Sequence, residues 1–100
     1  MFSYVFHPLA EAELDEAVGY YEAIQLGKGL ELAGQVHAAI DQLRAYPEAA
    51  PTARGTVRSI VVQSPARWSY TLHYRIKEST LRILAVAHHK RQPFYWFGRR

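Results

Sequence analysis

Hydrophobic residues change their spacing midway along the chain, from a helical period to a strand-like one. Before residue 50 they recur every three or four positions, which is the period of one face of an amphipathic helix. Two helices are predicted, the first beginning at Pro8 and the second ending before Pro47. The positions expected to face the interior are Ala10, Leu14, Ala17, Tyr21 and Ile24 in the first helix and Ala33, Val36, Ile40 and Leu43 in the second.

A short glycine-containing segment separates the two predicted helices. Gly27 and Gly29 can adopt the left-handed conformation that ends helices, so we expect them to cap the first helix. Since the connection is short, the two helices should pack as an antiparallel hairpin. Residues 2–6, which are aromatic and β-branched, are predicted to form a strand before the hairpin.

After Gly55 the hydrophobic period becomes two, which indicates strands. Residues 57–62 form one predicted strand, and residues 81–87 form another that is apolar on both faces apart from Arg82. Residues 68–76 alternate most regularly, with His73 and Arg75 on one face of the predicted strand. The large apolar side chains of its other face, expected to pack against the helices, are Trp68, Tyr70, Leu72, Tyr74 and Ile76.

The order of these elements predicts an α+β domain. A strand, two helices and three strands follow one another, and the last three strands should form an antiparallel meander with the helix hairpin on one face. A chain of 100 residues is too short for two domains of ordinary size, so residues 1–100 are expected to form one.

Composition excludes several classes of protein. Hydrophobic residues make up 49% of the chain and charged residues 21%, which is typical of a globular protein. The absence of cysteine excludes disulfides and thiolate chemistry, and no metal site or cofactor is predicted. The N-terminal segment lacks a basic leader, and no stretch reaches the roughly 18 apolar residues of a membrane span. We therefore expect a cytoplasmic protein with no membrane partner.

Charge is distributed unevenly along the chain. Residues 1–50 hold eight acidic and two basic residues, a formal charge of −6, whereas residues 51–100 hold ten basic residues and one acidic residue, a formal charge of +9. This asymmetry indicates either that the second half faces an anionic partner or that the two halves attract each other across the fold.

Four segments in order resemble the RelE/ParE family of bacterial toxins. They are residues 13–22, residues 39–47, residues 55–58 together with 67–76, and residues 82–93, which read RILAVAHHKRQP and are followed by Tyr95, Trp96 and Arg99. The family commonly has Phe-Pro where this chain has Trp68-Ser69, a change expected to alter local packing alone. The uninterrupted helix hairpin and the Ala-Val-Ala-His end of the last strand are more similar to the ParE branch than to the RelE branch.

The resemblance implies a RelE-like fold and a toxin of a type II toxin–antitoxin system. A cognate antitoxin would neutralise it by wrapping an extended helical segment around it, across the sheet and along the helices, and a toxin–antitoxin heterotetramer is expected. ParE-like members bind and poison DNA gyrase, whereas RelE-like members cut messenger RNA on the ribosome. A third alternative is a non-toxic family member that retains antitoxin binding.

Ribonuclease chemistry without a metal requires proton-transfer groups and cations at the phosphate. In that alternative His88 and Tyr95 would transfer protons while Arg58 and Arg75 would bind the phosphate, with His73, His89, Lys90 and Arg91 as further candidates. The simpler alternative is structural. It has His88 bonded to a backbone carbonyl, His89 in solvent, and the arginines paired with acidic residues.

Antitoxin or target binding is predicted for basic and aromatic residues of the second half. Exposed aromatic side chains beside arginines anchor protein partners or stack on bases, although Tyr95 and Trp96 could instead fold back over the core. Acidic residues of the antitoxin are expected to contact Arg58, Arg75 and Arg82. The full predicted set is Arg58, Arg67, Arg75, Arg82, Lys90, Arg91, Trp96 and Arg99.

Overall fold

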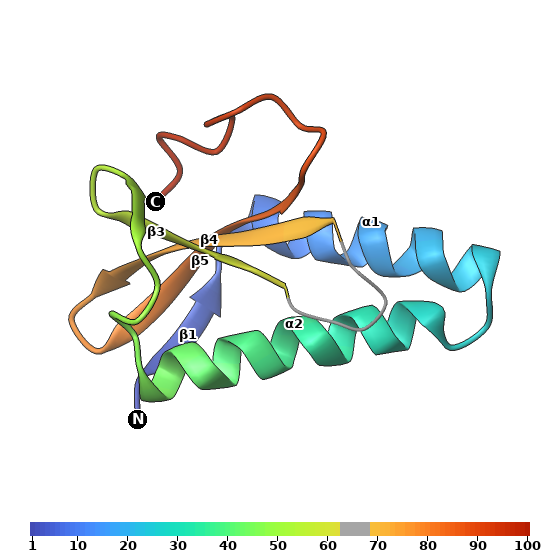
Figure 1. Ribbon diagram of the computed structural model, residues 1–100, viewed down its shortest axis with the longest axis horizontal. Coiled ribbons are helices and arrows are strands. Elements are labelled where there is room, and N and C mark those ends of the chain that lie inside the picture. Colours follow the sequence, from blue (N-terminus) through green and yellow to red (C-terminus); the bar gives the residue numbers. More distant parts are fainter. Residues whose placement is uncertain (63–68) are drawn as a thin grey trace.

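The elements follow the predicted order, with one addition. The computed structural model describes residues 1–62 and 69–100 of the chain, so Arg67 and Trp68 lie outside the described residues. Its elements are β1 (Ser3–Phe6), α1 (Pro8–Ile24), α2 (Lys28–Ala45), β2 (Thr52–Arg54), β3 (Val57–Val61), β4 (Tyr70–Lys77) and β5 (Thr80–His88) (Figure 1). The α+β class is confirmed, and the short β2 is the added element.

The sheet is mixed, with strand order β1-β5-β4-β3-β2. The predicted antiparallel meander holds for β3, β4 and β5. β1, however, pairs in parallel with β5, from Ser3 opposite Thr80 to Phe6 opposite Ile83. The helix hairpin between β1 and the later strands is long enough to carry the chain across the sheet, as parallel pairing requires. β2 was missed because its three residues are all exposed and lack a hydrophobic alternation.

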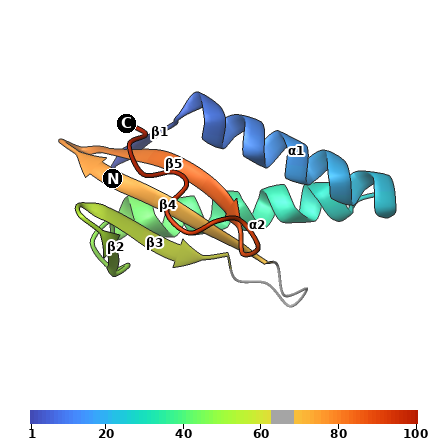
Figure 2. The same ribbon diagram turned by 90° about the horizontal axis from the view of Figure 1, so that it is seen from above.

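The sheet lies between two unequal layers. The helix hairpin covers one face, and residues 89–100 lie on the other (Figure 2). The helix-side core contains most of the predicted interior positions, including Ala10, Leu14, Val36, Leu72 and Tyr74. Two of the positions predicted to be interior are not. Ile24 is 63% exposed, and Ala33 is half-buried while its neighbour Leu32 is buried in its place. Ile24 is exposed because the end of the hairpin extends beyond the strands (Figure 1).

A β-bulge in β5 builds a second, smaller core on the opposite face. His73 pairs with Ala85 and Tyr74 pairs with Ile83, which leaves Leu84 as an extra residue in β5. A bulge of this kind turns neighbouring side chains to the same side of a sheet. Leu84 and Ala85 therefore both face away from the helices, where they pack with Val57 and Trp96.

The turn between the helices uses its glycines differently from the prediction. α1 ends at Ile24 without a left-handed cap, and Gly27, at φ 89°, instead precedes the first residue of α2. Glu22 Oε1 accepts hydrogen bonds from the N–H groups of Gly29 (2.9 Å) and Leu30 (3.3 Å). The first amides of a helix have no partner within it, so the Glu22 carboxylate caps α2. Hydrogen bonds from backbone N–H groups, of which that of Gly27 has the largest effect, lower the pKa of Glu22.

Gly29 is required where the two helices approach most closely. An added Cβ would lie 2.6 Å from Glu22 Cγ and closer still to the backbone oxygen of Val18.

Gly29→Ala should therefore lower the free energy of unfolding by about 2 kcal/mol through overpacking. Gly34 is a matched control in the same helix, because its Cβ would meet nothing within 4 Å. Gly34→Ala should raise stability by about 0.5–1 kcal/mol, since it only removes a glycine from a helix. Urea unfolding followed by circular dichroism measures both, and equal effects would contradict the close approach.

Candidate functional site

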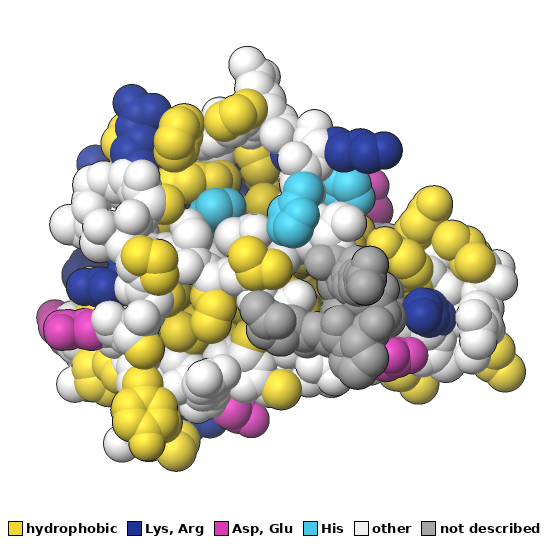
Figure 3. All heavy atoms as spheres, in the orientation of Figure 1, with side chains coloured by type: hydrophobic (Ala, Val, Ile, Leu, Met, Phe, Trp, Pro, Cys, Tyr) yellow, Lys and Arg dark blue, Asp and Glu magenta, His cyan; other side chains and the backbone are white. Residues whose placement is uncertain are grey.

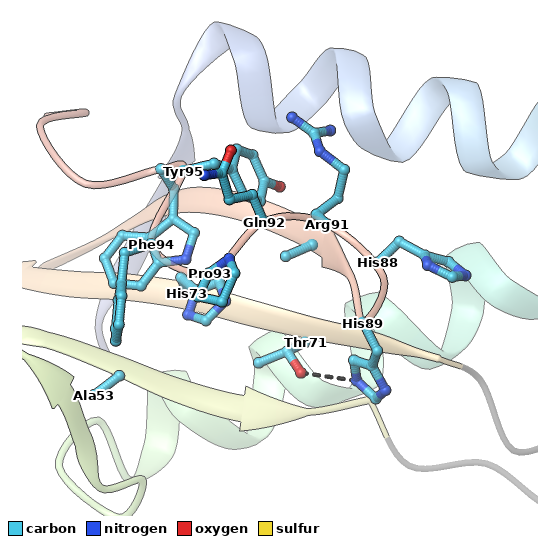
Figure 4. Close-up of a pocket in the computed structure, with 12 residues that line it drawn as sticks. Ala53, Thr71, His73, His88, His89, Arg91, Gln92, Pro93, Phe94 and Tyr95 are labelled. Atoms are coloured by element: carbon cyan, nitrogen blue, oxygen red, sulfur yellow. Dashed lines mark hydrogen bonds between the residues drawn. The ribbon is translucent and has the colours of Figure 1, made fainter.

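A pocket of about 290 Å³ lies between the sheet and the C-terminal segment, on the face away from the helices. β4 and β5 supply its floor, and residues 91–96 supply its wall (Figure 4). It contains all three histidines named as candidates from the sequence, His73, His88 and His89, together with Tyr95. Its lining includes Thr71, His73, His88, His89, Arg91, Phe94, Tyr95 and Trp96.

Five groups converge on the carboxylate of Glu13, which α1 directs toward the end of β5. It accepts hydrogen bonds from the N–H of Val86 (3.0 Å) and the hydroxyl of Tyr95 (2.8 Å). Arg99 donates from both terminal nitrogens, at 3.1 and 3.2 Å, and Arg91 Nη1 lies 3.8 Å away. The side chains of Glu13 and Arg99 are 14% and 13% exposed, so this is a largely buried, bidentate ion pair.

The backbone explains why Glu13 and Arg99 meet at this position. β1 accompanies β5 only as far as Ile83, because the chain leaves the sheet at His7 to begin α1. The next groups along this edge of β5 therefore have no strand partner. Glu13 bonds the Val86 N–H, and Arg99 Nη1 donates to the Leu84 carbonyl at 2.9 Å. The two side chains thus provide hydrogen-bond partners for the β5 backbone groups that β1 does not reach.

Tyr95 is held as a hydrogen-bond donor. Its ring lies beneath the guanidinium groups of Arg91 and Arg99, whose central carbons are 3.9 and 5.1 Å from the ring centroid. Burial, and after it the hydrogen bond to Glu13, raises the pKa of Tyr95 far above neutral pH. Tyr95 is therefore a protonated structural contact at neutral pH, not a free base.

Trp96 and His73 pack against each other over the sheet. Their rings stack at 4.4 Å with an interplanar angle of 24°, and Trp96 is 2% exposed. The alternative in which Trp96 folds back on the core is confirmed. The exposed aromatic side chains of this segment are its neighbours Phe94 and Phe97. Burial lowers the pKa of His73 to about 4, so the ring is neutral at pH 7, with Nδ1 2.6 Å from the Ser59 hydroxyl.

The paired histidines at the end of β5 have separate local contacts. His88 Nδ1 accepts a hydrogen bond from the Lys90 N–H at 3.1 Å, whereas the structural alternative had predicted a bond to a carbonyl. Its ring meets that of Tyr70 edge-on at 5.2 Å. His89 is exposed, and its Nε2 lies 3.0 Å from the Thr71 hydroxyl, as the dashed line in Figure 4 shows.

The four residues predicted for a ribonuclease do not lie on one face of the sheet. Arg58 pairs with Tyr74 across β3 and β4, on the helix side, and donates to the carbonyls of Glu48 (3.1 Å) and Ala50 (2.6 Å). It thereby holds the loop that follows α2. Arg75, the residue after Tyr74, faces the opposite side of the strand. Arg58 and Arg75 are therefore separated by the sheet itself.

Three arginines form a row across the face that carries the C-terminal segment. Arg75 of β4 pairs directly with Arg82 of β5. On the other side of β4, Arg58 of β3 pairs with Tyr74, so Val57, the residue before Arg58, lies level with Arg75. Arg54 of β2 pairs with Val57 and therefore continues the same line across the sheet. We call Arg54, Arg75 and Arg82 the arginine row. Like charges directly opposite in a sheet are unfavourable unless an anion offsets them.

The arginine row has few partners of its own. The Nε atoms of Arg75 and Arg82 are buried without a hydrogen bond, and Arg82 Nη2 donates to the carbonyl of Arg100 at 3.1 Å. The Arg54 guanidinium lies 4.9 and 4.5 Å from the ring centroids of Phe94 and Phe97. In the described part of the chain, no acidic side chain forms an ion pair with any of the three. The row therefore suits an anionic partner.

The remaining predicted binding residues fall into two groups. Lys90 is exposed in the turn after β5, and Arg91 is about half exposed at the rim of the pocket. Arg99 forms its ion pair with Glu13 inside the fold.

Over residues 1–62 and 69–100, no cluster of three or more His, Asp or Glu side chains is suited to a metal ion, and no helix is long and apolar enough to cross a membrane.

Sequence reasoning missed Glu13 and Arg54. Glu13 was one of several acidic residues in the first turns of a helix, which the helix dipole favours in any protein. Arg54 lies in the unpredicted β2, and its ring contacts join residues 40 or more positions apart. Neither contact leaves a periodic signal along the chain.

Removal of the Glu13 charge should weaken the whole fold. Glu13→Gln would leave Arg99 largely buried without its counter-ion, so we expect the free energy of unfolding to fall by about 3 kcal/mol. Glu16→Gln, which removes the same charge from an exposed position one turn along α1, should change it by less than about 0.5 kcal/mol. Urea unfolding of both variants tests this. If Glu13→Gln lowers the free energy of unfolding no more than Glu16→Gln does, the ion pair does not stabilise the fold.

Comparisons with known proteins place this arrangement in a family. The chain matches the family model described as the ParE toxin of type II toxin–antitoxin system, parDE, over residues 4–93. It is similar to a solved structure titled "Chromosomal ParDE TA system from P. aeruginosa", with a TM-score of 0.73 and 23% sequence identity, over 88% of this chain and 96% of that one. No curated protein matches it. Because the family model covers most of the sequence, the chain belongs to the ParE toxin family of type II toxin–antitoxin systems.

Proposed function

We propose that this toxin inhibits DNA gyrase, and with it replication, by binding, and that a cognate antitoxin neutralises it. The observation that carries the proposal is the match to the ParE family over residues 4–93. The solved structure with the same fold is titled as a ParDE system, which pairs a toxin with an antitoxin. A heterotetramer of toxin and antitoxin is part of the same proposal.

Action by binding is favoured by the state of the groups that catalysis would need. The Tyr95 hydroxyl donates a hydrogen bond to Glu13, and Arg58 is bonded to two loop carbonyls on the other side of the sheet. His73 is neutral beneath Trp96, with its Nδ1 bonded to Ser59. A ribosome-dependent endoribonuclease would have to break several of these contacts before its chemistry began.

The arginine row supplies a docking surface for an acidic antitoxin segment. Arg75 and Arg82 repel each other across the strands, and carboxylates placed between them would replace that repulsion with charge-assisted hydrogen bonds. Phe94 and Phe97 lie beside Arg54 at the end of the row and provide apolar contact area. A stable complex on this face should bury more than about 1,000 Å² in total.

Toxicity should survive the loss of the two candidate proton-transfer groups. We expect a chain carrying both His88→Ala and Tyr95→Phe to stop thymidine incorporation soon after induction in bacteria, while leucine incorporation continues, as for the unmodified chain. The measurement is pulse-labelling of DNA and protein synthesis without antitoxin. Early loss of leucine incorporation by the unmodified chain, abolished in the variant, would support the ribonuclease instead. An unmodified chain with no effect on either label would indicate a family member that only binds antitoxin.

Antitoxin affinity should depend on the arginine row. Arg75→Gln and Arg82→Gln are each expected to weaken binding by about ten-fold or more, because each removes a charge-assisted hydrogen bond. Lys28→Gln, a cation on the hairpin, is the control and should leave affinity within about two-fold. Isothermal titration of the purified antitoxin measures all three, and unchanged affinity for both arginine variants would refute this docking surface.

Arg58→Ala must be interpreted differently from the other arginine variants. It removes the hydrogen bonds to the carbonyls of Glu48 and Ala50, so it should lower stability as well as affinity. Its unfolding curve is therefore needed before any loss of antitoxin binding is assigned to a direct contact.

A further inference from the structure

The pocket between the sheet and the C-terminal segment has the charge of a site for an anion. It has a volume of about 290 Å³, and the described residues that line it include three histidines and Arg91 but no aspartate or glutamate. Histidine side chains gather in the upper part of this face in the space-filling view, with basic side chains on either side of them (Figure 3). An anionic ligand is therefore favoured here over a cationic one.

Arg91 is available to such an anion. Its Nη1 lies 3.8 Å from Glu13 Oε2, beyond hydrogen-bond distance, and its side chain is 52% exposed. Arg99 already donates to both oxygens of Glu13, at 3.1 and 3.2 Å, so the carboxylate charge is balanced without Arg91. Lys90, the residue before Arg91, is exposed. Two cations therefore stand at this end of the pocket.

A third cation lies at the opposite end. Ala53 and Phe94 line one end of the pocket, whereas the histidines at the end of β5 line the other (Figure 4). Arg54, the residue after Ala53, packs with its guanidinium 4.9 Å from the centroid of the Phe94 ring, and over residues 1–62 and 69–100 it has no acidic partner. Cations at both ends of one pocket suit a chain that repeats its negative charge, as a nucleotide strand does with its phosphates.

Phe94 presents an exposed aromatic ring to the pocket in a strained backbone conformation. Its φ of 59° lies in the left-handed region, which is unfavourable for a bulky side chain. The surrounding turn is held by hydrogen bonds from the Tyr95 N–H to the Gln92 carbonyl (3.4 Å) and from the Phe97 N–H to the Phe94 carbonyl (2.9 Å). Strain of this kind is concentrated at binding sites, so the ring, which is 43% exposed, is suited to stacking on a ligand.

These features select an unpaired nucleotide among anionic ligands. Its base is a flat aromatic group that can stack on Phe94, and the exposed amide of Gln92 can both donate to and accept from the base edge. A base within a duplex is paired and stacked, so it cannot enter a pocket. An acidic peptide would need an aromatic side chain with an acid on either side of it, whereas every internal nucleotide has this arrangement.

We propose that the pocket binds one unpaired nucleotide of a single-stranded stretch of DNA. The base lies against Phe94, one flanking phosphate contacts Arg91 and Lys90, and the other contacts Arg54. This deepens the proposed function and rests on it for the source of the strand, because a gyrase poison acts where the enzyme has opened DNA. Since Arg54 also belongs to the arginine row, an antitoxin bound there would exclude the strand.

The experiment titrates the full chain into a fluorescein-labelled oligothymidine of about 12 nucleotides, without gyrase, and follows fluorescence anisotropy. A duplex and an oligouridine of the same length are the comparison probes. The pocket variants are Phe94→Ala and Arg91→Gln, and Phe94→Tyr keeps a ring in place. The matched controls are Phe97→Ala, an exposed phenylalanine of the same segment outside the pocket lining, and Lys77→Gln, an exposed cation at the end of β4.

We expect stacking and charge to be separable in these titrations. Phe94→Ala should weaken binding by about five-fold or more, whereas Phe94→Tyr and both controls should stay within about two-fold of the unmodified chain. Arg91→Gln should weaken binding and also reduce the slope of log affinity against log salt concentration by about 0.7, a slope that Phe94→Ala should leave unchanged. The duplex should bind at least about ten-fold more weakly than the oligothymidine.

Several results would overturn this nucleotide site. Absence of oligothymidine binding would do so, as would equal losses in the pocket variants and their controls, because general charge attraction would then explain the binding. A duplex that binds as tightly as the single strand would also overturn it, and tighter binding of the oligouridine would assign the pocket to RNA. Each of these failures leaves gyrase inhibition standing, since the titration contains no gyrase. Oligothymidine binding by a chain without effect on gyrase would instead refute the proposed function alone.

Discussion

The carboxylate of Glu13 joins three parts of the chain that the backbone ladders leave unconnected. It accepts a hydrogen bond from an amide of β5 where β1 has ended, pairs with Arg99 from the C-terminal segment, and accepts a hydrogen bond from the hydroxyl of Tyr95. Because this pair is largely buried, removal of either member leaves an uncompensated charge. The stack of Trp96 on His73, and the position of Phe94 and Phe97 beside Arg54, depend on a C-terminal segment that Glu13 holds against the sheet.

Charge divides the folded molecule as it divides the sequence. The acidic first half forms the helix hairpin, and most of the basic second half lies on and around the opposite face of the sheet. Among residues 1–62 and 69–100, ion pairs between the two halves occur at one place, the contact of Glu13 with Arg91 and Arg99. Elsewhere the arginine row and the acidic face of α1 remain available, so the molecule offers surfaces of opposite charge to its partners.

Periodicity predicted the elements well because each buries one regular face. The helix hairpin and the alternation through Leu72 and Tyr74 appear as expected. The failures have local physical causes: β2 is too short and exposed to show a period, and the β5 bulge at Leu84 is set by pairing with β4. The site was less predictable. Arg58 and Arg75 looked equivalent along the sequence, but strand register places them on opposite faces, and the partners of Glu13 are contacts between residues more than 70 positions apart.

The most direct test of a toxin that acts by binding is a cleavage assay with purified DNA gyrase and supercoiled plasmid. If the chain poisons gyrase, adding it should cause linear, doubly cleaved DNA to accumulate, and prior mixing with the antitoxin should prevent this. If plasmid and supercoiling activity were unaffected while the same preparation cut messenger RNA on ribosomes, the toxin would be a ribonuclease and not a gyrase poison.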